Sequence, residues 1–178
     1  MRTPLSIDVV ESSSISPVTL RGICELCTDA YQEDFTEAFT ILGPGVHVVG
    51  RAGGAIVSHA MWVERALQPG TRAPLRTAYV EAVATKPAFQ RRGLASEILK
   101  RLAEEIRHYD LGALSPAAET LYARLGWELW RGPLFIRTAA GLEPTPAESV
   151  MILRVEHTPA DLDLNQPLSA EWRPGELW

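Results

Sequence analysis

The sequence predicts a single α+β domain in which helices flank a mixed, twisted β-sheet. Its 178 residues suit one domain with a substantial core. The apolar residues change from helical spacing to strand alternation and back along the chain. An apolar strand at 76–85, a loop, an amphipathic helix and a short apolar strand at 111–115 follow one another. This succession is typical of a parallel β-helix-β crossover, which is right-handed.

The expected order of elements is strand, two helices, three strands, helix, strand, helix and further strands. Ser16-Pro17 begins the first helix, because a hydroxyl cap precedes proline at the first helical position. Arg51-Ala-Gly-Gly54 lies between two β-rich segments and indicates a hairpin. Strands are expected at 6–11, 46–50, 55–66, 76–85, 111–115, 127–131 and 149–155, and helices at 17–31, 35–41, 92–108 and after Ser115-Pro116.

Composition excludes several classes of function. The net charge of −5 is the opposite of what a nucleic-acid binder shows and suits a cationic partner. There is no apolar stretch long enough for a membrane span, and we expect no secretory leader. Cys24 and Cys27 fall on one helix face, where small reduced core residues are favoured over a redox or zinc site. The four histidines show no metal-ligand spacing. We therefore expect a cytoplasmic protein without a metal.

The sharpest local motif is Gln90-Arg91-Arg92-Gly93-Leu94-Ala95, between the apolar strand and the clearest helix. The N-terminus of a helix has unpaired N–H groups and a partial positive charge, so it binds phosphate well. Gly93 and Ala95 keep bulk away from the backbone, and Arg91 and Arg92 add positive charge. The alternative is a basic loop with a glycine at a helix start. The surrounding strand, loop and helix favour a phosphate site.

This motif resembles the Q/R-x-x-G-x-G/A motif of the GCN5-related N-acetyltransferases (GNAT), where it holds the pyrophosphate of acetyl-CoA. The resemblance implies a GNAT fold with six to seven strands and about four helices. It also implies acetyl-CoA as co-substrate, bound by Val83, Thr85 and residues 90–95. Leu121-Tyr-Ala-Arg-Leu-Gly-Trp127 is similar to the later helix of that family, in which a tyrosine faces the sulfur; Tyr122 holds that place.

Within this superfamily the chain is similar to the aminoglycoside 2′-N-acetyltransferases, from about residue 30 to residue 178. The most specific match is the ending W-R-x-G-[DE]-x-W. The segments that carry the resemblance are Asp34-Phe-Thr-Glu37, Tyr79-Val-Glu81, Tyr109-Asp-Leu-Gly-Ala-Leu-Ser115, Leu121-Tyr122, Gly126-Trp127, Trp130-Arg-Gly-Pro133 and Trp172-Arg-Pro-Gly-Glu-Leu-Trp178.

Two residues are candidates for acetyl transfer to an amine. Glu81 is the only acid in its apolar strand, where Tyr79, Glu81, Val83 and Thr85 are expected on one face. It is either paired structurally or held to take the proton of a cationic amine. Backbone N–H groups near Val83 would polarise the thioester carbonyl. Tyr122 is either a packed helix residue or the proton donor to the leaving thiolate.

Two tryptophans among residues 172–178 predict an ordered tail, 157–178, rather than a frayed end. The resemblance implies that Glu176 and the carboxylate of Trp178 bind the aminoglycoside, with Asp34 and Glu148 as further acids. The alternative is a solvated acidic surface. Segment 37–47 is shorter and less acidic than in the family, which points to a smaller substrate such as kasugamycin.

The expected function is acetyl-CoA-dependent N-acetylation of an aminoglycoside 2′-amine, by direct transfer in a ternary complex, conferring antibiotic resistance. The alternatives are a GNAT enzyme that acetylates a polyamine, a peptide N-terminus or a lysine, and a non-catalytic CoA-binding module. A homodimer is compatible with the resemblance, because many relatives dimerise.

Overall fold

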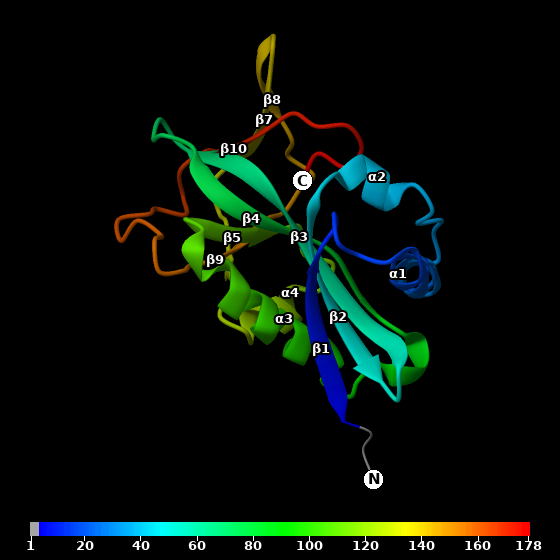
Figure 1. Ribbon diagram of the computed structural model, residues 1–178. Helices are drawn as coiled ribbons and strands as arrows, with labels where there is room; N and C mark the ends of the chain where they lie inside the picture. Colours follow the sequence, from blue (N-terminus) through cyan, green and yellow to red (C-terminus); the bar gives the residue numbers. More distant parts are fainter. Residues whose placement is uncertain (1–3) are drawn as a thin grey trace. The chain divides into compact units, whose positions relative to one another are not determined.

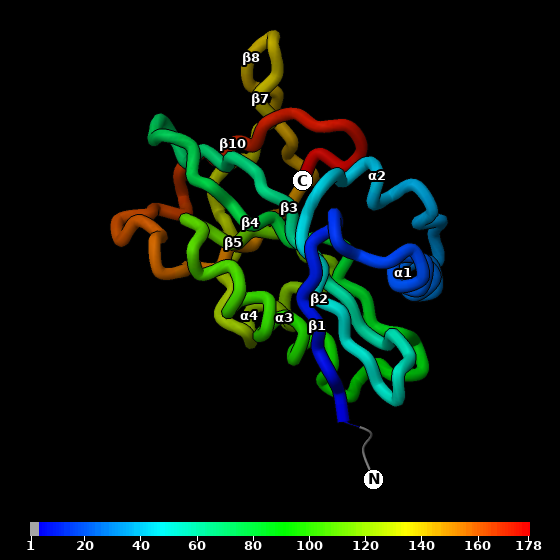
Figure 2. The backbone as a smooth tube through the Cα atoms, in the orientation of Figure 1, coloured from blue at the N-terminus to red at the C-terminus, as the bar shows by residue number. Residues whose placement is uncertain are grey.

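A computed structural model describes residues 4–178 (Figures 1 and 2). The chain forms two compact units. The first unit comprises residues 4–63 and 80–104, and the second unit comprises residues 64–79 and 105–178. Two strands, β3 (Ala55–Pro69) and β4 (Leu75–Thr85), each contribute to both units.

The sheet of the first unit is antiparallel. Strand β2 (Gly45–Ala52) pairs with β1 (Leu5–Glu11) on one side and with β3 on the other. Ala52 pairs with Ala55, so Gly53 and Gly54 form a two-residue turn, and both have positive φ, of 57° and 84°. Such turns need residues that adopt positive φ at low cost. The hairpin expected from the glycine pair is confirmed.

Helices cover both faces of this sheet. Helix α1 (Pro17–Tyr31) packs Ile23, Leu26 and Cys27 against Val49. The next residue, Gly50, faces the other side, where a Cβ would lie 2.9 Å from the Ile98 side chain of α3 (Leu94–Glu105). Figure 1 shows α1 and α3 on opposite sides of these strands. The short helices α2 (Ala38–Leu42) and η1 (Pro87–Phe89) complete the unit.

The second unit contains a mixed sheet in the order β6-β9-β5-β4-β3-β10-β7-β8. Strand β5 runs parallel to β4 and β10 runs parallel to β7, and the other pairs with a recorded register are antiparallel. Helices η2 (Ile106–His108) and α4 (Glu119–Ala123) belong to the same unit. The remaining strands are β5 (Leu111–Leu114), β6 (Glu128–Leu129), β7 (Leu134–Thr138), β8 (Gly141–Pro144), β9 (Met151–Leu153) and β10 (Leu168–Glu171).

The α+β class and the mixed sheet are confirmed, but the described residues form ten strands rather than six to seven. The sequence missed β7, β8 and β10, because these strands are short and β8 is exposed at every residue. The helix start at Ser115-Pro116 was wrong. Helix α4 begins at Glu119 and has no side-chain cap. Five helical residues are too few for apolar spacing to fix a boundary.

Helix α1 has the expected bounds, and the Ser16 hydroxyl accepts the Thr19 N–H at 3.1 Å. The third helix is shorter than expected, since a 3₁₀ turn replaces its last residues at Ile106–His108. No helix within residues 4–178 is long and apolar enough to cross a membrane.

Candidate functional site

The loop before α3, residues 90–93, is called the anion loop below, because its geometry suits an anion. Gln90 donates its side-chain amide to Thr85 O at 3.2 Å, which ties the loop to the end of β4. Arg91 and Gly93 have positive φ, of 58° and 82°, and Gly93 O accepts the Glu97 N–H at 3.1 Å. A Cβ at Gly93 would meet no atom within 4 Å, so open space lies over the backbone there.

The same loop exposes two cations. The side chains of Arg91 and Arg92 lie at the surface, and the Arg92 guanidinium sits 5.1 Å from the centre of the Phe89 ring. The first turn of α3 follows at once, and its N–H groups have no partner within the helix. Gln90, Arg91, Arg92, Gly93, Leu94 and Ala95 are thus suited to a phosphate group.

The end of β4 departs from a regular strand. Ala82 has φ of 50°, a conformation that is rare for a residue with a side chain. Four consecutive carbonyls from this position accept side-chain donors: His59 Nδ1 lies 2.9 Å from Ala82 O, and Tyr31 Oη lies 2.9 Å from Val83 O. The other two contacts are Ser58 Oγ to Ala84 O, at 3.1 Å, and Gln90 Nε2 to Thr85 O.

Glu81 lies immediately before this irregularity and is half-buried. The sequence predicts that side chains alternate regularly between the two faces of the strand from Tyr79 to Thr85. The left-handed Ala82 interrupts this alternation, because it locally reorients the strand. Val83 follows it, and the Thr85 hydroxyl lies 2.8 Å from Ser58 Oγ. Glu81, Val83 and Thr85 therefore lie on the end of β4 that leads into the anion loop.

A pair of buried histidines behind this segment was missed by sequence reasoning. His47 Nδ1 lies 3.0 Å from His59 Nε2, and the rings are 1% and 0% exposed. Burial lowers the pKa of His47 to about 4 and that of His59 to about 3, so both rings are neutral at physiological pH. The hairpin register pairs His47 with Met61, so His59, two residues before Met61, is a diagonal neighbour of His47. The signal in the sequence was therefore a histidine on each strand of the expected hairpin.

Asp34 lies in the loop after α1 and is exposed. The Thr36 hydroxyl and N–H both donate to its carboxylate, and these hydrogen bonds lower its pKa. The carboxylate is therefore ionised at neutral pH.

In the second unit, Tyr122 lies on α4 and is 5% exposed. Its ring packs edge-on against Trp127, with 6.0 Å between centroids. Burial raises the pKa of its hydroxyl to about 12. The hydroxyl therefore keeps its proton at neutral pH, which a proton donor requires.

The C-terminal segment of the second unit is anchored. It leaves β10 and bends back before it ends (Figure 2). Arg65, 3% exposed, donates to Leu177 O at 2.8 Å and to Glu171 O at 2.7 Å. The Trp178 indole is 4% exposed and donates to Thr145 Oγ1 at 2.8 Å.

Thr145 contacts two of the residues that carry predicted acids. Its carbonyl accepts the Glu148 N–H at 3.1 Å, while its hydroxyl receives the Trp178 indole. The Glu148 and Glu176 side chains are exposed, and Arg173 Nε donates to Glu176 O. The tail thus presents the Glu176 side chain on an anchored backbone.

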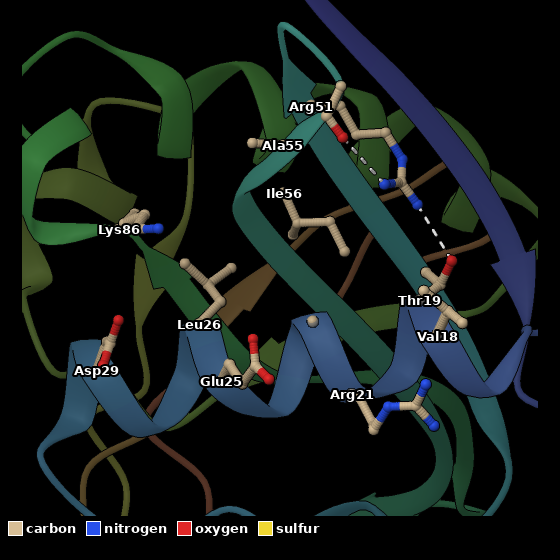
Figure 3. A pocket seen from close by; sticks show the side chains of 12 residues that line it. Val18, Thr19, Arg21, Glu25, Leu26, Asp29, Arg51, Ala55, Ile56 and Lys86 are labelled. Atoms are coloured by element: carbon tan, nitrogen blue, oxygen red, sulfur yellow. Dashed lines mark hydrogen bonds between the residues drawn. The ribbon is translucent and has the colours of Figure 1, made fainter.

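A separate groove of about 420 Å³ lies between α1 and the β2–β3 turn (Figure 3). Arg51 lines it and donates to Thr19 Oγ1 at 3.2 Å. Basic and acidic side chains both line it, and the predicted site residues lie elsewhere in the described chain. Within residues 4–178 there is no group of three or more His, Cys, Asp or Glu side chains suited to a metal ion.

Comparison with known proteins gives concordant results. A family model described as an acetyltransferase (GNAT) domain matches residues 14–130. An aminoglycoside 2′-N-acetyltransferase of Mycolicibacterium fortuitum is 34% identical over 179 residues, covering 96% of this chain and 90% of that protein.

Two solved structures share the fold. The GNAT family N-acetyltransferase YhbS of Escherichia coli, in complex with CoA, is 16% identical with a TM-score of 0.63, covering 97% of this chain and 90% of that one. Eis1 of Mycobacterium abscessus is 16% identical with a TM-score of 0.62, covering 74% of this chain and 33% of that one. The family match over more than half of the sequence, together with the nearly full-length relative, shows that the chain belongs to the GNAT family of acetyltransferases.

Proposed function

We propose that this protein transfers the acetyl group of acetyl-CoA to the 2′-amine of an aminoglycoside. The observation that carries the proposal is the 34% identity to the M. fortuitum aminoglycoside 2′-N-acetyltransferase, which extends over 96% of the chain. A likeness of this extent reaches well beyond the segment that holds the anion loop.

The anion loop fits the pyrophosphate of acetyl-CoA. Gly93 leaves open space above the backbone, and the first turn of α3 offers N–H donors beside Arg91 and Arg92. The N–H of Val83 would bind the thioester carbonyl, and Thr85 would line the path toward the loop. Acetyl-CoA supplies the acyl group as a reactive thioester.

Three of the chain's groups would move protons and stabilise charge. The Glu81 carboxylate takes a proton from the substrate ammonium, directly or through water, and leaves a neutral amine. That nitrogen bonds to the thioester carbon, and the Val83 N–H holds the developing oxyanion. The carbon–sulfur bond then breaks, the Tyr122 hydroxyl protonates the leaving thiolate, and the amide nitrogen loses its second proton to the resulting phenolate, directly or through water. Transfer is direct within a ternary complex.

The acids of the chain would hold the polycationic sugar. We infer this role for Asp34, Glu81, Glu148, Glu176 and the Trp178 carboxylate. Segment 157–178 is proposed as the substrate-binding tail of a single acetyltransferase domain, because Arg65 and Thr145 anchor its end. The shortened segment 37–47 favours kasugamycin over the larger 2-deoxystreptamine drugs, and acetylation would confer resistance.

The test is CoA thiol release by the untagged protein with kasugamycin, gentamicin, a polyamine and a peptide. The expected result is turnover with an aminoglycoside, acetylation of the 2′-nitrogen by mass spectrometry and NMR, and little turnover with the other amines. The control variant is Glu81→Gln, which lacks the proposed base. It should lose activity while still binding CoA. Preferential turnover of the polyamine or peptide would overturn the substrate, and CoA binding without turnover of any amine would overturn the enzyme.

A further inference from the structure

We propose that Ser12, His47 and His59 form a positioning device that fixes the left-handed conformation of Ala82 and thereby orients Glu81 and Val83. None of the three contacts the substrates in this scheme, so they are positioning residues. The inference rests on the proposed function for its catalytic consequence, whereas the geometry of the chain of hydrogen bonds is independent of it.

The hydrogen bonds among these residues have only one consistent direction. Ala82 O is an acceptor, so His59 Nδ1, 2.9 Å away, must carry the proton. The neutral ring then has a bare Nε2, which accepts from His47 Nδ1 at 3.0 Å. Both imidazoles are therefore Nδ1–H tautomers.

The chain of hydrogen bonds begins at Ser12. His47 Nε2 is bare in the neutral ring, so the Ser12 hydroxyl, 3.1 Å away, donates to it. Gly45 O lies 3.0 Å from Ser12 Oγ and competes for the single hydroxyl proton, but it also receives the Ser12 N–H at 2.9 Å, whereas without that proton Ser12 Oγ and His47 Nε2 would face each other as two acceptors. The Gly45 N–H in turn donates to Ser12 Oγ at 3.1 Å, so every member of the chain has a partner.

The chain of hydrogen bonds ends at Ala82, whose backbone conformation requires support. A residue with a Cβ is strained at a φ of 50° and keeps it only when its surroundings impose it. The His59 ring is fully buried, and Phe39 packs edge-on against both imidazoles, with centroids 5.5 and 5.8 Å apart. The donor on Ala82 O is therefore held in place by packing as well as by its neighbour His47.

The consequence falls on the two flanking residues. Glu81 precedes Ala82 and is the proposed base, and Val83 follows it and offers the proposed oxyanion donor. If Ala82 relaxed to an extended conformation, the peptide planes on both sides would rotate. The carboxylate and the N–H would then lose their common alignment, although each residue would remain present.

The first test is spectroscopic and needs no substrate. Long-range ¹H–¹⁵N correlation spectra of the whole protein, at pH 7.5, report which nitrogen of each histidine carries the proton. We expect Nδ1–H at both His47 and His59, and loss of that signature at His47 in His59→Leu. An Nε2–H tautomer at His59 would overturn the proposal.

The second test separates positioning from general stability. His59→Leu should lower kcat at least tenfold, with less than threefold change in KM for the amine and in the Kd for CoA. His59→Asn keeps a donor near the Nδ1 position and should restore most of the kcat. Val48→Ala removes buried volume from the same strand as His47 and is the control for lost stability; its kcat should stay within threefold.

The third test addresses the backbone itself. Glycine adopts positive φ at little cost, so adding Ala82→Gly to His59→Leu should recover at least threefold in kcat. Equal kcat in the single and double variants, or an equal loss in Val48→Ala, would overturn the positioning role. An absence of acetyl transfer by the wild-type protein would count against the proposed function alone, because the tautomer measurement stands without it.

Discussion

Acid should destabilise this protein through its buried histidine pair. The pKa values of His47 and His59 fall from 6.5 to about 4 and about 3 because burial disfavours the charged ring. In the unfolded chain both rings take up protons as the pH falls below 6.5, whereas in the native protein they stay neutral. Stability is therefore full above pH 6.5 and decreases as the pH falls toward the native pKa values.

The size of the effect at pH 5 depends little on the native pKa values, since both lie below that pH. One pKa unit corresponds to about 1.36 kcal/mol, and pH 5 lies 1.5 units below the unfolded value of 6.5. Each ring should thus lower the free energy of unfolding at pH 5 by about 2 kcal/mol, and the pair by about 4 kcal/mol. The lowered pKa values of Asp34, Asp161 and Asp163 act only below about pH 4, outside this window.

Urea unfolding followed by tryptophan fluorescence at pH 8 and pH 5 measures this difference. The matched variant is His47→Gln with His59→Asn, which lacks both titrating rings and should lose the drop that they cause. A wild-type free energy of unfolding that changes by less than about 1 kcal/mol between the two pH values would refute the reasoning. An equal drop in the double variant would refute it as well.

Four further outcomes are expected. Gly93→Glu should abolish CoA binding measured by calorimetry, since bulk and negative charge enter the phosphate site; unchanged affinity in a folded variant would remove that assignment. Tyr122→Phe should lower kcat by about 10²-fold with CoA affinity intact, and wild-type turnover would move the acid elsewhere. Three residues added after Trp178 should raise the aminoglycoside KM by about tenfold, in comparison with the untagged chain, whereas equal KM values would leave the tail a packing role only. Gly132→Ala should lower the Tm, because its Cβ would clash with the backbone carbonyl of Gln166, and an unaltered Tm would contradict the close approach.

Local signals sufficed for much of the first unit. Ser16-Pro17 and the apolar spacing after it predicted α1 from Pro17 to Tyr31, because capping and helical periodicity are properties of neighbouring residues. The glycine pair at 53–54 predicted the β2–β3 turn for the same reason. The motif at residues 90–95 could be singled out as a phosphate-site candidate because Gly93 and its strand-loop-helix setting lie within one short segment, and that role stays a prediction.

The remaining features depend on residues distant in sequence. The left-handed Ala82 has no local mark, since alanine is unusual there and the supporting donor comes from His59, 23 positions earlier. The histidine pair depends on the register of a hairpin. Arg65 reads as an ordinary surface arginine until Leu177 and Glu171 are seen to accept from it, 112 and 106 positions away. Periodicity contains no information about such partners.

The burial of the cysteines has a practical consequence for measuring turnover. Cys27 lies on the buried face of α1, and burial raises the pKa of its thiol to about 12; the pKa of the half-buried Cys24 is raised for the same reason. Only a thiolate attacks a disulfide reagent, so the folded protein should consume such a reagent slowly, and by at most one equivalent per chain at Cys24. Any faster or larger colour development in a continuous thiol assay therefore reports free CoA, and the wild-type chain needs no cysteine substitutions before its kinetics are recorded.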